Sequence, residues 1–306
     1  MCADTCILIS SHDRYASLAH LTQTQIDKQW QYHPPVYFSG LSALNGSRLL
    51  ELRRDPVDWI GVTLDAVQDL LSHGYHSVYL VLDDHPPLDR CQPNLLNHVL
   101  PKILFERDAT NISLFGSGQG RQVEGQTTLD SCGGLEVLPE SYLWKYSLHP
   151  GLWSLSKLQR LLGRLDADLT CLDTRHPWSF ERIGGGYRSM IDGEKMGLSY
   201  RIAAPFEGFW SKDRILAASY RSAGNMARYF AGVIGGPNAW NYLSHQFDFA
   251  YHYFDGGYPM LWRGVMEKGC PNSEFKRFCK YFVKHNLMQT TTAALVSLDY
   301  GVPSKR

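Results

Sequence analysis

One segment, residues 77–87, constrains the fold of this chain more than any other. It reads SVYLVLDDHPP: six residues suited to a buried strand, two aspartates, a histidine, and two prolines that end the strand. A strand that can be buried on both faces is typical of the centre of a parallel sheet. The residues that follow such a strand emerge at the carboxyl edge, where open α/β folds bind their ligands. The segment therefore predicts an α/β fold with Asp83 and Asp84 at its ligand-binding edge.

Asp83 and Asp84 have two interpretations. Neighbouring carboxylates repel each other unless a positive charge lies beside them, and a divalent cation that carries a diphosphate would supply one. Alternatively, the two residues only begin the turn before Pro86, because aspartate is common in turns. The first interpretation predicts a binding site, and the second predicts a turn that has no functional role.

Strands and helices alternate around this segment. The pattern of apolar residues predicts strands at 6–10, 36–39 and 111–115, and helices at 16–30, 58–73 and 94–107. Gly74 is expected to end the helix before the Asp83 strand, and Pro101 is expected to break or kink the helix at 94–107. Strands and helices joined by short connections are the pattern of a parallel α/β sheet. We therefore expect a doubly wound mixed sheet of the Rossmann-like kind.

The second half of the chain is less regular. Residues 135–138 and 143–148 could pair as strands, and residues 152–165 carry leucines along one side of a predicted helix. Further elements are expected as a strand at 200–204 and helices at 212–232, 238–254 and 273–286. The glycine-rich stretch 183–200 marks the expected boundary. We therefore expect a core, residues 1–185, and a helical extension, residues 186–306, that packs on it.

Composition excludes several classes of protein. Basic and acidic residues number 30 each, so no overall field favours nucleic acid as a partner. The 7 cysteines are scattered, without the spacing of a zinc site or a disulfide framework, and free thiols fit a reducing cytosol. The first residues lack the features of a signal peptide, and no segment is apolar enough to span a membrane. We therefore expect a cytoplasmic protein.

Residues 273–286 form a basic amphipathic pattern. Phe275, Phe278 and Phe282 fall on one face of the predicted helix, and four lysine or arginine residues fall elsewhere on it. Such a helix can lie on an anionic membrane, which would bring the protein to the inner face of the membrane. Alternatively, the aromatic face docks on the protein and the basic face stays in solvent.

Three segments, in this order, carry a resemblance to a known family. They are the N-terminal strand and polar loop at 7–13, the helix that runs into LDD at 82–84, and YSLHPGLW at 146–153 with PWSFE at 177–181. Over residues 5–185 the chain resembles bacterial nucleotide-sugar glycosyltransferases of the GT-A fold, in the broad family-2-like group. The resemblance implies a GT-A-like sheet and transfer of a sugar from a nucleoside-diphosphate donor to a hydroxyl acceptor. Residues 186–306 would then shape the acceptor side.

By this resemblance, Asp83 and Asp84 stand in the place of the acidic motif that binds the metal and the donor diphosphate. The implied cofactor is Mg²⁺ or Mn²⁺, because these hard cations prefer carboxylate oxygens, and Asp84 is the expected ligand. The chain departs from the family at two positions. Asp-Asp-His replaces Asp-x-Asp, which makes His85 a second candidate ligand, and His149 stands where relatives often carry glutamine.

The resemblance makes Glu181 the expected catalytic base. An inverting transfer needs a carboxylate that takes the proton from the acceptor hydroxyl as this hydroxyl attacks the anomeric carbon. Trp178 and Phe180 flank Glu181 and would keep it partly dry, which raises the proton affinity of a carboxylate. Without the resemblance, PWSFE is only a turn into a short helix with one exposed acid.

The resemblance also implies contacts to the donor and the acceptor. Ser10, Ser11 and Asp13 follow the first strand, at the edge where the nucleotide would lie. The side chains expected to contact the sugars are His149, Trp153 and Trp178. The implied partners are a nucleoside-diphosphate sugar and a carbohydrate or lipid-linked acceptor.

Two other functions remain open at this point. A nucleotidyltransferase on a related sheet would release pyrophosphate, and it would need a glycine-rich and basic phosphate loop near the N-terminus, where residues 10–14 offer one arginine. A catalytically inactive sugar-binding or scaffold protein could keep the same sheet, and it would show no metal-dependent donor binding. The fold alone does not choose among these functions.

Overall fold

A computed structural model of the chain describes its fold. The described residues are 4–11, 15–40, 47–50, 53–87, 91–114, 135–138, 144–186, 196–202, 266–267, 270–271 and 275–284. The predicted helices at 212–232 and 238–254 lie outside these ranges, and so does Asp13.

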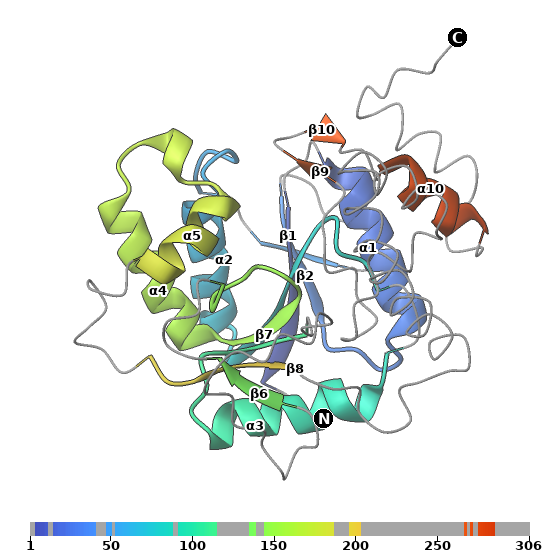
Figure 1. Ribbon diagram of the computed structural model, residues 1–306, viewed down its shortest axis with the longest axis horizontal. Helices are drawn as coiled ribbons and strands as arrows, with labels where there is room; N and C mark the ends of the chain where they lie inside the picture. Colours follow the sequence, from blue (N-terminus) through green and yellow to red (C-terminus); the bar gives the residue numbers. More distant parts are fainter. Residues whose placement is uncertain are drawn as a thin grey trace, which may run out of the picture.

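Eight strands of the described chain form one mixed sheet (Figure 1). Their order across the sheet is β3-β2-β1-β4-β7-β5-β8-β6. The strands are β1 Thr5–Ser10, β2 Val36–Ser39, β3 Arg48–Leu50, β4 Ser77–Leu82, β5 Asn111–Ser113, β6 Leu135–Leu138, β7 Gly151–Ser154 and β8 Ser199–Ile202. A separate antiparallel pair consists of β9 Met266–Glu267 and β10 Cys270–Pro271.

Helices cover both faces of the sheet. The helices are α1 Ala16–Gln29, α2 Trp59–Ser72, α3 Leu100–Glu106, α4 Leu155–Asp168, α5 Pro177–Gly186 and α10 Phe275–Lys284. Residues of α1 and α3 share one apolar cluster with one face of β1 and β4, while residues of α2, α4 and α5 share a second cluster with the other face. Figure 1 shows α2, α4 and α5 on the side of the sheet opposite to α1. The doubly wound, Rossmann-like α/β fold expected from the sequence is thus confirmed.

The strand at residues 77–82 lies at the centre of the sheet, as its sequence predicts. Val78 and Leu80 of β4 belong to one apolar cluster, and Tyr79 and Val81 belong to the other. The strand therefore buries both faces, which explains why its sequence is apolar throughout instead of alternating.

The order of the strands reverses between β1 and β4. β1 pairs in parallel with β2 on one side and with β4 on the other. α1 connects β1 to β2 over one face, and α2 leads from β3 back to β4 over the opposite face. This is a topological switch point, and open α/β sheets bind ligands outside the carboxyl ends of the strands at such a point.

Local interactions explain where α2 begins and ends. The Asp58 carboxylate accepts a 2.9 Å hydrogen bond from the backbone N–H of Gly61 and thereby caps the first turn. Gly74 follows the helix with a φ of 85°, a left-handed conformation that glycine adopts without a steric penalty. The predicted limits of this helix, Asp58 and Gly74, are confirmed.

Two predictions about the second half of the sheet are wrong. Residues 135–138 form a strand, but β6 pairs antiparallel with β8, and residues 144–146 form a turn instead of its partner. The predicted helix at 152–165 begins only at Leu155, because residues 151–154 form β7 between β4 and β5. Leu152 and Trp153 are both fully buried, one in each apolar cluster. A strand covered on both faces does not alternate between polar and apolar residues. In the sequence, residues 152–154 therefore look like the beginning of the leucine-rich helix that follows.

The helix is irregular next to Pro101, as predicted, whereas the boundary near residue 185 needs adjustment. The irregular part of the helix precedes the proline: residues 95–99 form a π-helical turn that runs into α3, and Pro101 lies in the first turn of α3. Proline has no N–H to bond to the preceding turn and crowds the carbonyl four residues earlier, which accounts for the widened π-helical turn directly before it. The sheet takes in β8, so its pairing continues beyond residue 185. The rest of the division into two domains stays a prediction.

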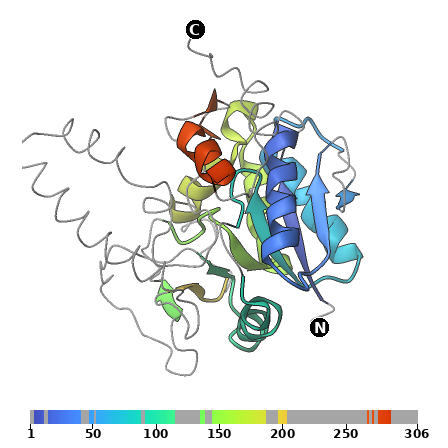
Figure 2. The ribbon, with the colours of Figure 1, turned by 90° about the vertical axis from the view of Figure 1, so that its right-hand side faces the viewer.

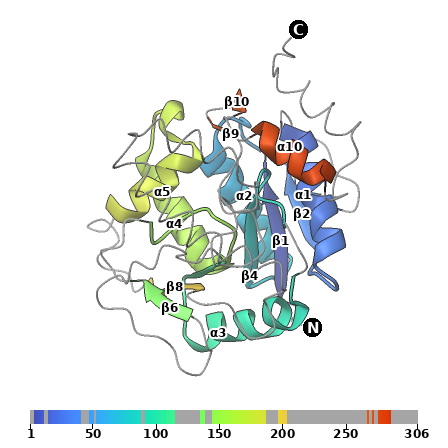
Figure 3. The same ribbon diagram turned by 45° about the vertical axis from the view of Figure 1, so that its right-hand side comes forward.

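The aromatic face of α10 packs within the protein. Phe275 and Phe278 are buried and stack on each other with ring centroids 6.2 Å apart. For residues 275–284, the part of the predicted helix that the structure describes, this is the docked alternative. α10 lies beside α1, with β9 and β10 at the end of the sheet where β1 ends (Figure 1, Figure 2 and Figure 3). None of the helices in the described ranges has the length and apolar content needed to cross a bilayer.

Candidate active site

The register of the two central strands brings Ser11 and Asp83 together. Ser10 of β1 pairs with Leu82 of β4, so the next residue of each strand emerges at the same point of the carboxyl edge. The Ser11 hydroxyl donates a 2.7 Å hydrogen bond to Oδ2 of Asp83. On the other side, the Thr22 hydroxyl of α1 donates a 2.5 Å hydrogen bond to the Asp83 backbone carbonyl. Asp83 is therefore held at the switch point by Ser11, which follows β1, and by Thr22 of α1.

Asp84 is buried, and both of its carboxylate oxygens have close neighbours. Oδ1 lies 2.9 Å from Nδ1 of His85, an ion-pair distance at which the ring is not aligned for a hydrogen bond. Oδ2 accepts a 3.1 Å hydrogen bond from the backbone N–H of Met266 in β9. A segment from the last part of the chain therefore reaches the end of β4.

The charges at the end of β4 are strongly coupled. Burial, and then the neighbouring Asp84 charge, raises the pKa of Asp83 to about 7. Burial also opposes the charge of Asp84, but His85 and the Met266 N–H outweigh it and lower the pKa of Asp84. The pKa of His85 is raised, because Asp84, Asp83 and Glu181 outweigh the effect of burial. Asp84 and His85 therefore form an ion pair, and Asp83 is the carboxyl group of the site that holds its proton most tightly.

Glu181 of α5 binds the loop before β7. Its Oε1 accepts a 2.7 Å hydrogen bond from the backbone N–H of Leu148 and a 3.1 Å hydrogen bond from the Ser147 hydroxyl. The same hydroxyl contacts Nδ1 of His149 and accepts a 3.2 Å hydrogen bond from the His149 backbone N–H. One carboxylate therefore organises the loop that carries His149.

His149 and His85 connect this loop to the end of β4. Their ring centroids lie 6.2 Å apart, with the ring planes at 72°. Burial, and then repulsion by His85, lowers the pKa of His149 to about 3, so its ring is neutral at ordinary pH. The carboxyl edge thus brings together Asp83, Asp84, His85, His149 and Glu181, which lie in three separate parts of the sequence.

The other predicted site residues have different surroundings. Ser10 is buried, and its hydroxyl lies 3.4 Å from that of Thr63 in α2. Trp153 is fully buried against Phe180, with ring centroids 6.0 Å apart, so its indole packs in the core and is not exposed to a sugar. Trp178 is 41% exposed, one helical turn before Glu181, and its ring is open to stacking.

The residues at the end of β4 suit a divalent cation that is shared with a ligand. No three His, Cys, Asp or Glu side chains in the described ranges are grouped so that they could hold a metal by themselves. Mg²⁺ is usually held by one or two carboxylates together with substrate phosphates, which needs fewer protein ligands. Asp83 and Asp84 offer two carboxylates. Burial, and then the charge of Asp84, raises the pKa of Asp83, and a cation between the two carboxylates would offset both effects.

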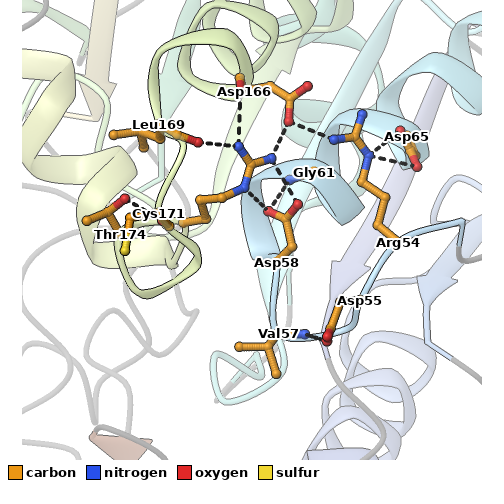
Figure 4. A network of polar contacts seen from close by, with 11 residues as sticks. Arg54, Asp55, Val57, Asp58, Gly61, Asp65, Asp166, Leu169, Cys171 and Thr174 are labelled. Atoms are coloured by element: carbon orange, nitrogen blue, oxygen red, sulfur yellow. Dashed lines mark hydrogen bonds and ion pairs between the residues drawn. The ribbon is translucent and has the colours of Figure 1, made fainter.

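A partly buried network of arginines and aspartates holds the start of α5 against α2 and α4. The Arg175 guanidinium donates two hydrogen bonds to Asp58, of 2.8 and 2.9 Å, and a third to the Asp166 carboxylate. Arg54 donates a 2.7 Å hydrogen bond to the same Asp166 oxygen and contacts both oxygens of Asp65. Figure 4 shows Arg54 and Asp58, both from the segment that leads into α2, together with Asp166 from α4. Because Arg175 lies just before α5, this network sets the position from which Glu181 reaches the loop.

Sequence reasoning missed three components of this arrangement. Ser147 lies within the segment 146–153 that carries the resemblance. A polar residue two positions before His149 could have indicated a contact with that histidine. Arg175 is 117 positions from Asp58, and the pattern of charges along the chain does not indicate such a pair. Met266 contributes only a backbone N–H, which no side-chain pattern can indicate.

The likeness of this chain to known proteins is structural and distant. No family model matches it, and no curated protein matches it. One solved structure with a similar arrangement is a cytidylyltransferase from Leptospira borgpetersenii serovar Hardjo-bovis, at 14% identity and a TM-score of 0.34, over 68% of this chain and 79% of that one. A likeness of this degree carries no argument about function, which has to come from the site itself.

Proposed function

We propose that this protein is a glycosyltransferase that moves a sugar from a nucleoside-diphosphate donor to a hydroxyl acceptor with inversion. One observation carries the proposal. Asp83 and Asp84 lie at the topological switch point of the sheet, in one electrostatic cluster with His85 and with Glu181. The ordered sequence segments that resemble GT-A glycosyltransferases contribute the same residues.

Asp83 and Asp84 would bind the donor diphosphate through a metal ion. A diphosphate is anionic, so it binds beside two carboxylates only together with a cation, and Asp83 and Asp84 would hold Mg²⁺ or Mn²⁺ there. Bound cation supplies positive charge to the leaving diphosphate. His85, paired with Asp84, would keep that carboxylate ionised, since its charge favours the deprotonated form.

Glu181 is the proposed base. Its two hydrogen bonds within the described chain both fall on Oε1, so they orient the carboxylate and leave Oε2 to receive a proton. In the transfer, the acceptor oxygen forms a bond to the anomeric carbon, the bond from that carbon to the diphosphate oxygen breaks, and Oε2 takes the acceptor proton. The exposed ring of Trp178 would stack on the acceptor sugar.

The experiment that tests this proposal follows the fate of the nucleotide. The protein is incubated with UDP-, GDP- and dTDP-sugars and Mn²⁺, with and without a mixture of glycan acceptors, and released nucleoside diphosphate is measured. Release that is abolished in Glu181→Gln supports the proposal. The matched control is Glu106→Gln, since the Glu106 side chain is 57% exposed on α3.

Two outcomes would contradict the proposal. Release of pyrophosphate from nucleoside triphosphates, without release of nucleoside diphosphate from any sugar donor, would assign nucleotidyl transfer instead. Absence of both reactions, together with absence of donor binding, would leave a protein that uses this sheet without catalysis.

A further inference from the structure

The Ser147 hydroxyl makes three polar contacts, and its chemistry decides the direction of each. A serine hydroxyl has one proton to donate and two lone pairs to accept. Its partners are Oε1 of Glu181 at 3.1 Å, the backbone N–H of His149 at 3.2 Å, and Nδ1 of His149. With three partners and three bonding positions, each contact can be assigned.

Two of these directions follow from the partners. A carboxylate oxygen only accepts, and Oε1 of Glu181 already accepts from the Leu148 N–H, so the single proton of Ser147 goes to Glu181. The backbone N–H of His149 can only donate. The remaining contact must therefore be a hydrogen bond from Nδ1–H of His149 to the Ser147 oxygen.

The opposite assignment is unfavourable. If Ser147 donated its proton to Nδ1, lone pairs of the hydroxyl and of the Glu181 carboxylate would face each other at 3.1 Å. The His149 ring is also neutral, because its partial burial opposes a charge and because the neighbouring His85 ring, paired with Asp84, carries a positive charge that repels a second one. A neutral imidazole with its proton on Nδ1 carries a lone pair on Nε2.

We propose that Glu181, acting through Ser147, fixes His149 in the tautomer that carries its proton on Nδ1, so that Nε2 is a hydrogen-bond acceptor in this site. Glu181 is thus a positioning residue for His149 as well as the proposed base. A ligand that reaches Nε2 has to present a donor, such as a sugar hydroxyl. The identity of that donor rests on the transferase function proposed above, whereas the tautomer does not depend on it.

The proposed tautomer is compatible with proton transfer to Glu181. The Ser147 and Leu148 contacts use Oε1, and the acceptor proton is taken by Oε2. The carboxyl group can therefore gain a proton on Oε2 while Oε1 still accepts from Ser147. The tautomer of His149 would stay the same before and after the transfer.

Nitrogen-15 NMR of the labelled full chain tests the proposal directly. Long-range proton–nitrogen correlations of an imidazole ring distinguish a protonated from an unprotonated nitrogen. At pH 7.5, His149 is expected to show a protonated Nδ1 and an unprotonated Nε2. Its signals are assigned by their absence from H149Q, with H149N as a second variant for the same purpose.

Variants of Ser147 test the cause of the tautomer. In S147A the Nδ1–H loses its acceptor, so a population with the proton on Nε2 is expected to appear. S147T keeps a hydroxyl and is expected to keep the original tautomer. His33 is the internal control, since its Nδ1 lies 2.8 Å from the Pro34 carbonyl, away from Ser147, and its signals should not change in S147A.

Clear outcomes would overturn the proposal. A wild-type His149 with its proton on Nε2, or with both nitrogens protonated at pH 7.5, contradicts it without the need for any variant. An unchanged tautomer in folded S147A would show that Glu181 and Ser147 do not set it. Failure of glycosyl transfer with the expected tautomer present would overturn the proposed function only, so the two failures are distinguishable.

Discussion

The hydroxyl of Ser11 donates a 2.7 Å hydrogen bond to the carboxylate of Asp83 across the ends of β1 and β4. The two strands are parallel neighbours, and the bond spans the point where the strand order reverses. A hydrogen bond to a carboxylate favours its ionised form, yet the pKa of Asp83 is raised to about 7, because burial and the charge of Asp84 outweigh that bond. The described residues at the switch point therefore do not compensate the negative charge of an ionised Asp83.

Asp83→Asn is expected to stabilise the protein at alkaline pH. The folded-state pKa of Asp83 is above its ordinary value of 3.8, so the folded state binds the extra proton and wild-type stability falls as the pH rises from about 4 to about 7. Asparagine removes this loss, so the variant should gain up to about 4 kcal/mol at pH 8, since each of the roughly three pH units is worth about 1.4 kcal/mol, and nothing at pH 4. Urea denaturation in EDTA at both pH values measures the difference.

Asp173→Asn is the control for this prediction, because Asp173 is exposed on a short turn before α5. The difference in stability between the Asp173→Asn variant and the wild type should be the same at both pH values. A loss of stability in Asp83→Asn at pH 8 would contradict the assigned charge state of Asp83.

Arg175→Met is expected to destabilise the fold strongly. The substitution leaves the buried Asp58 carboxylate and the Asp166 carboxylate without their shared cation, and breaking a buried pair in this way costs about 3–5 kcal/mol. Arg53→Met removes a comparable ion pair with Asp69, but the Arg53 side chain is 52% exposed, so the cost should be below about 1 kcal/mol. Equal denaturation midpoints for the two variants would refute a structural role for the Arg175 network.

Gly61→Ala and Gly163→Ala form a matched pair within helices. A Cβ on Gly61 would lie 2.4 Å from Oδ2 of Asp58 and 2.5 Å from Cδ of Arg54, so alanine must displace the network and should cost about 1–3 kcal/mol. A Cβ on Gly163 meets nothing within 4 Å, and alanine should stabilise α4 by about 0.5–1 kcal/mol. Thermal unfolding distinguishes the two, and opposite signs are the expected result.

Glu181→Gln is expected to separate chemistry from binding. Loss of a general base lowers turnover by about 10²–10⁴-fold. The affinity for the donor should stay nearly unchanged, since the base acts on the acceptor hydroxyl in the transition state. Steady-state kinetics with an identified donor measures both quantities. A variant that loses donor affinity in proportion to turnover would assign Glu181 to binding instead.

The sequence predicted the central half of the fold because local patterns determine it. The buried strand at 77–82, the Asp58 cap and the Gly74 stop are each encoded by neighbouring residues, and the structure has them where they were expected. Strand pairing is not local. Leu135–Leu138 was recognisable as a strand, but its partner is β8, more than sixty positions later, and periodicity contains no information about that choice.

The candidate site was predictable to a similar extent. Asp83 and Asp84 follow directly from the strand that precedes them, and the resemblance pointed to Glu181 and His149. The contact of Asp84 with the Met266 N–H joins residues 182 positions apart, and the Arg175 network joins segments more than a hundred positions apart. Trp153 illustrates a further limit of sequence patterns. A tryptophan in the segment 146–153 looks the same in the sequence whether it stacks on a ligand or fills the core.

A thermal-shift measurement with UDP, GDP and dTDP and their sugars, with Mg²⁺, with Mn²⁺ and with EDTA, shows most directly whether the carboxyl edge binds a nucleotide. A ligand that binds only the folded state at about 100 times its Kd adds about 2.7 kcal/mol of stability. We expect one nucleotide class to raise the melting temperature only with a divalent cation, and we expect Asp84→Asn to abolish this shift while Asp173→Asn keeps it. No shift with any of these ligands in the wild-type protein, or an equal shift in Asp84→Asn, would contradict the claim that the carboxyl edge binds a nucleoside diphosphate.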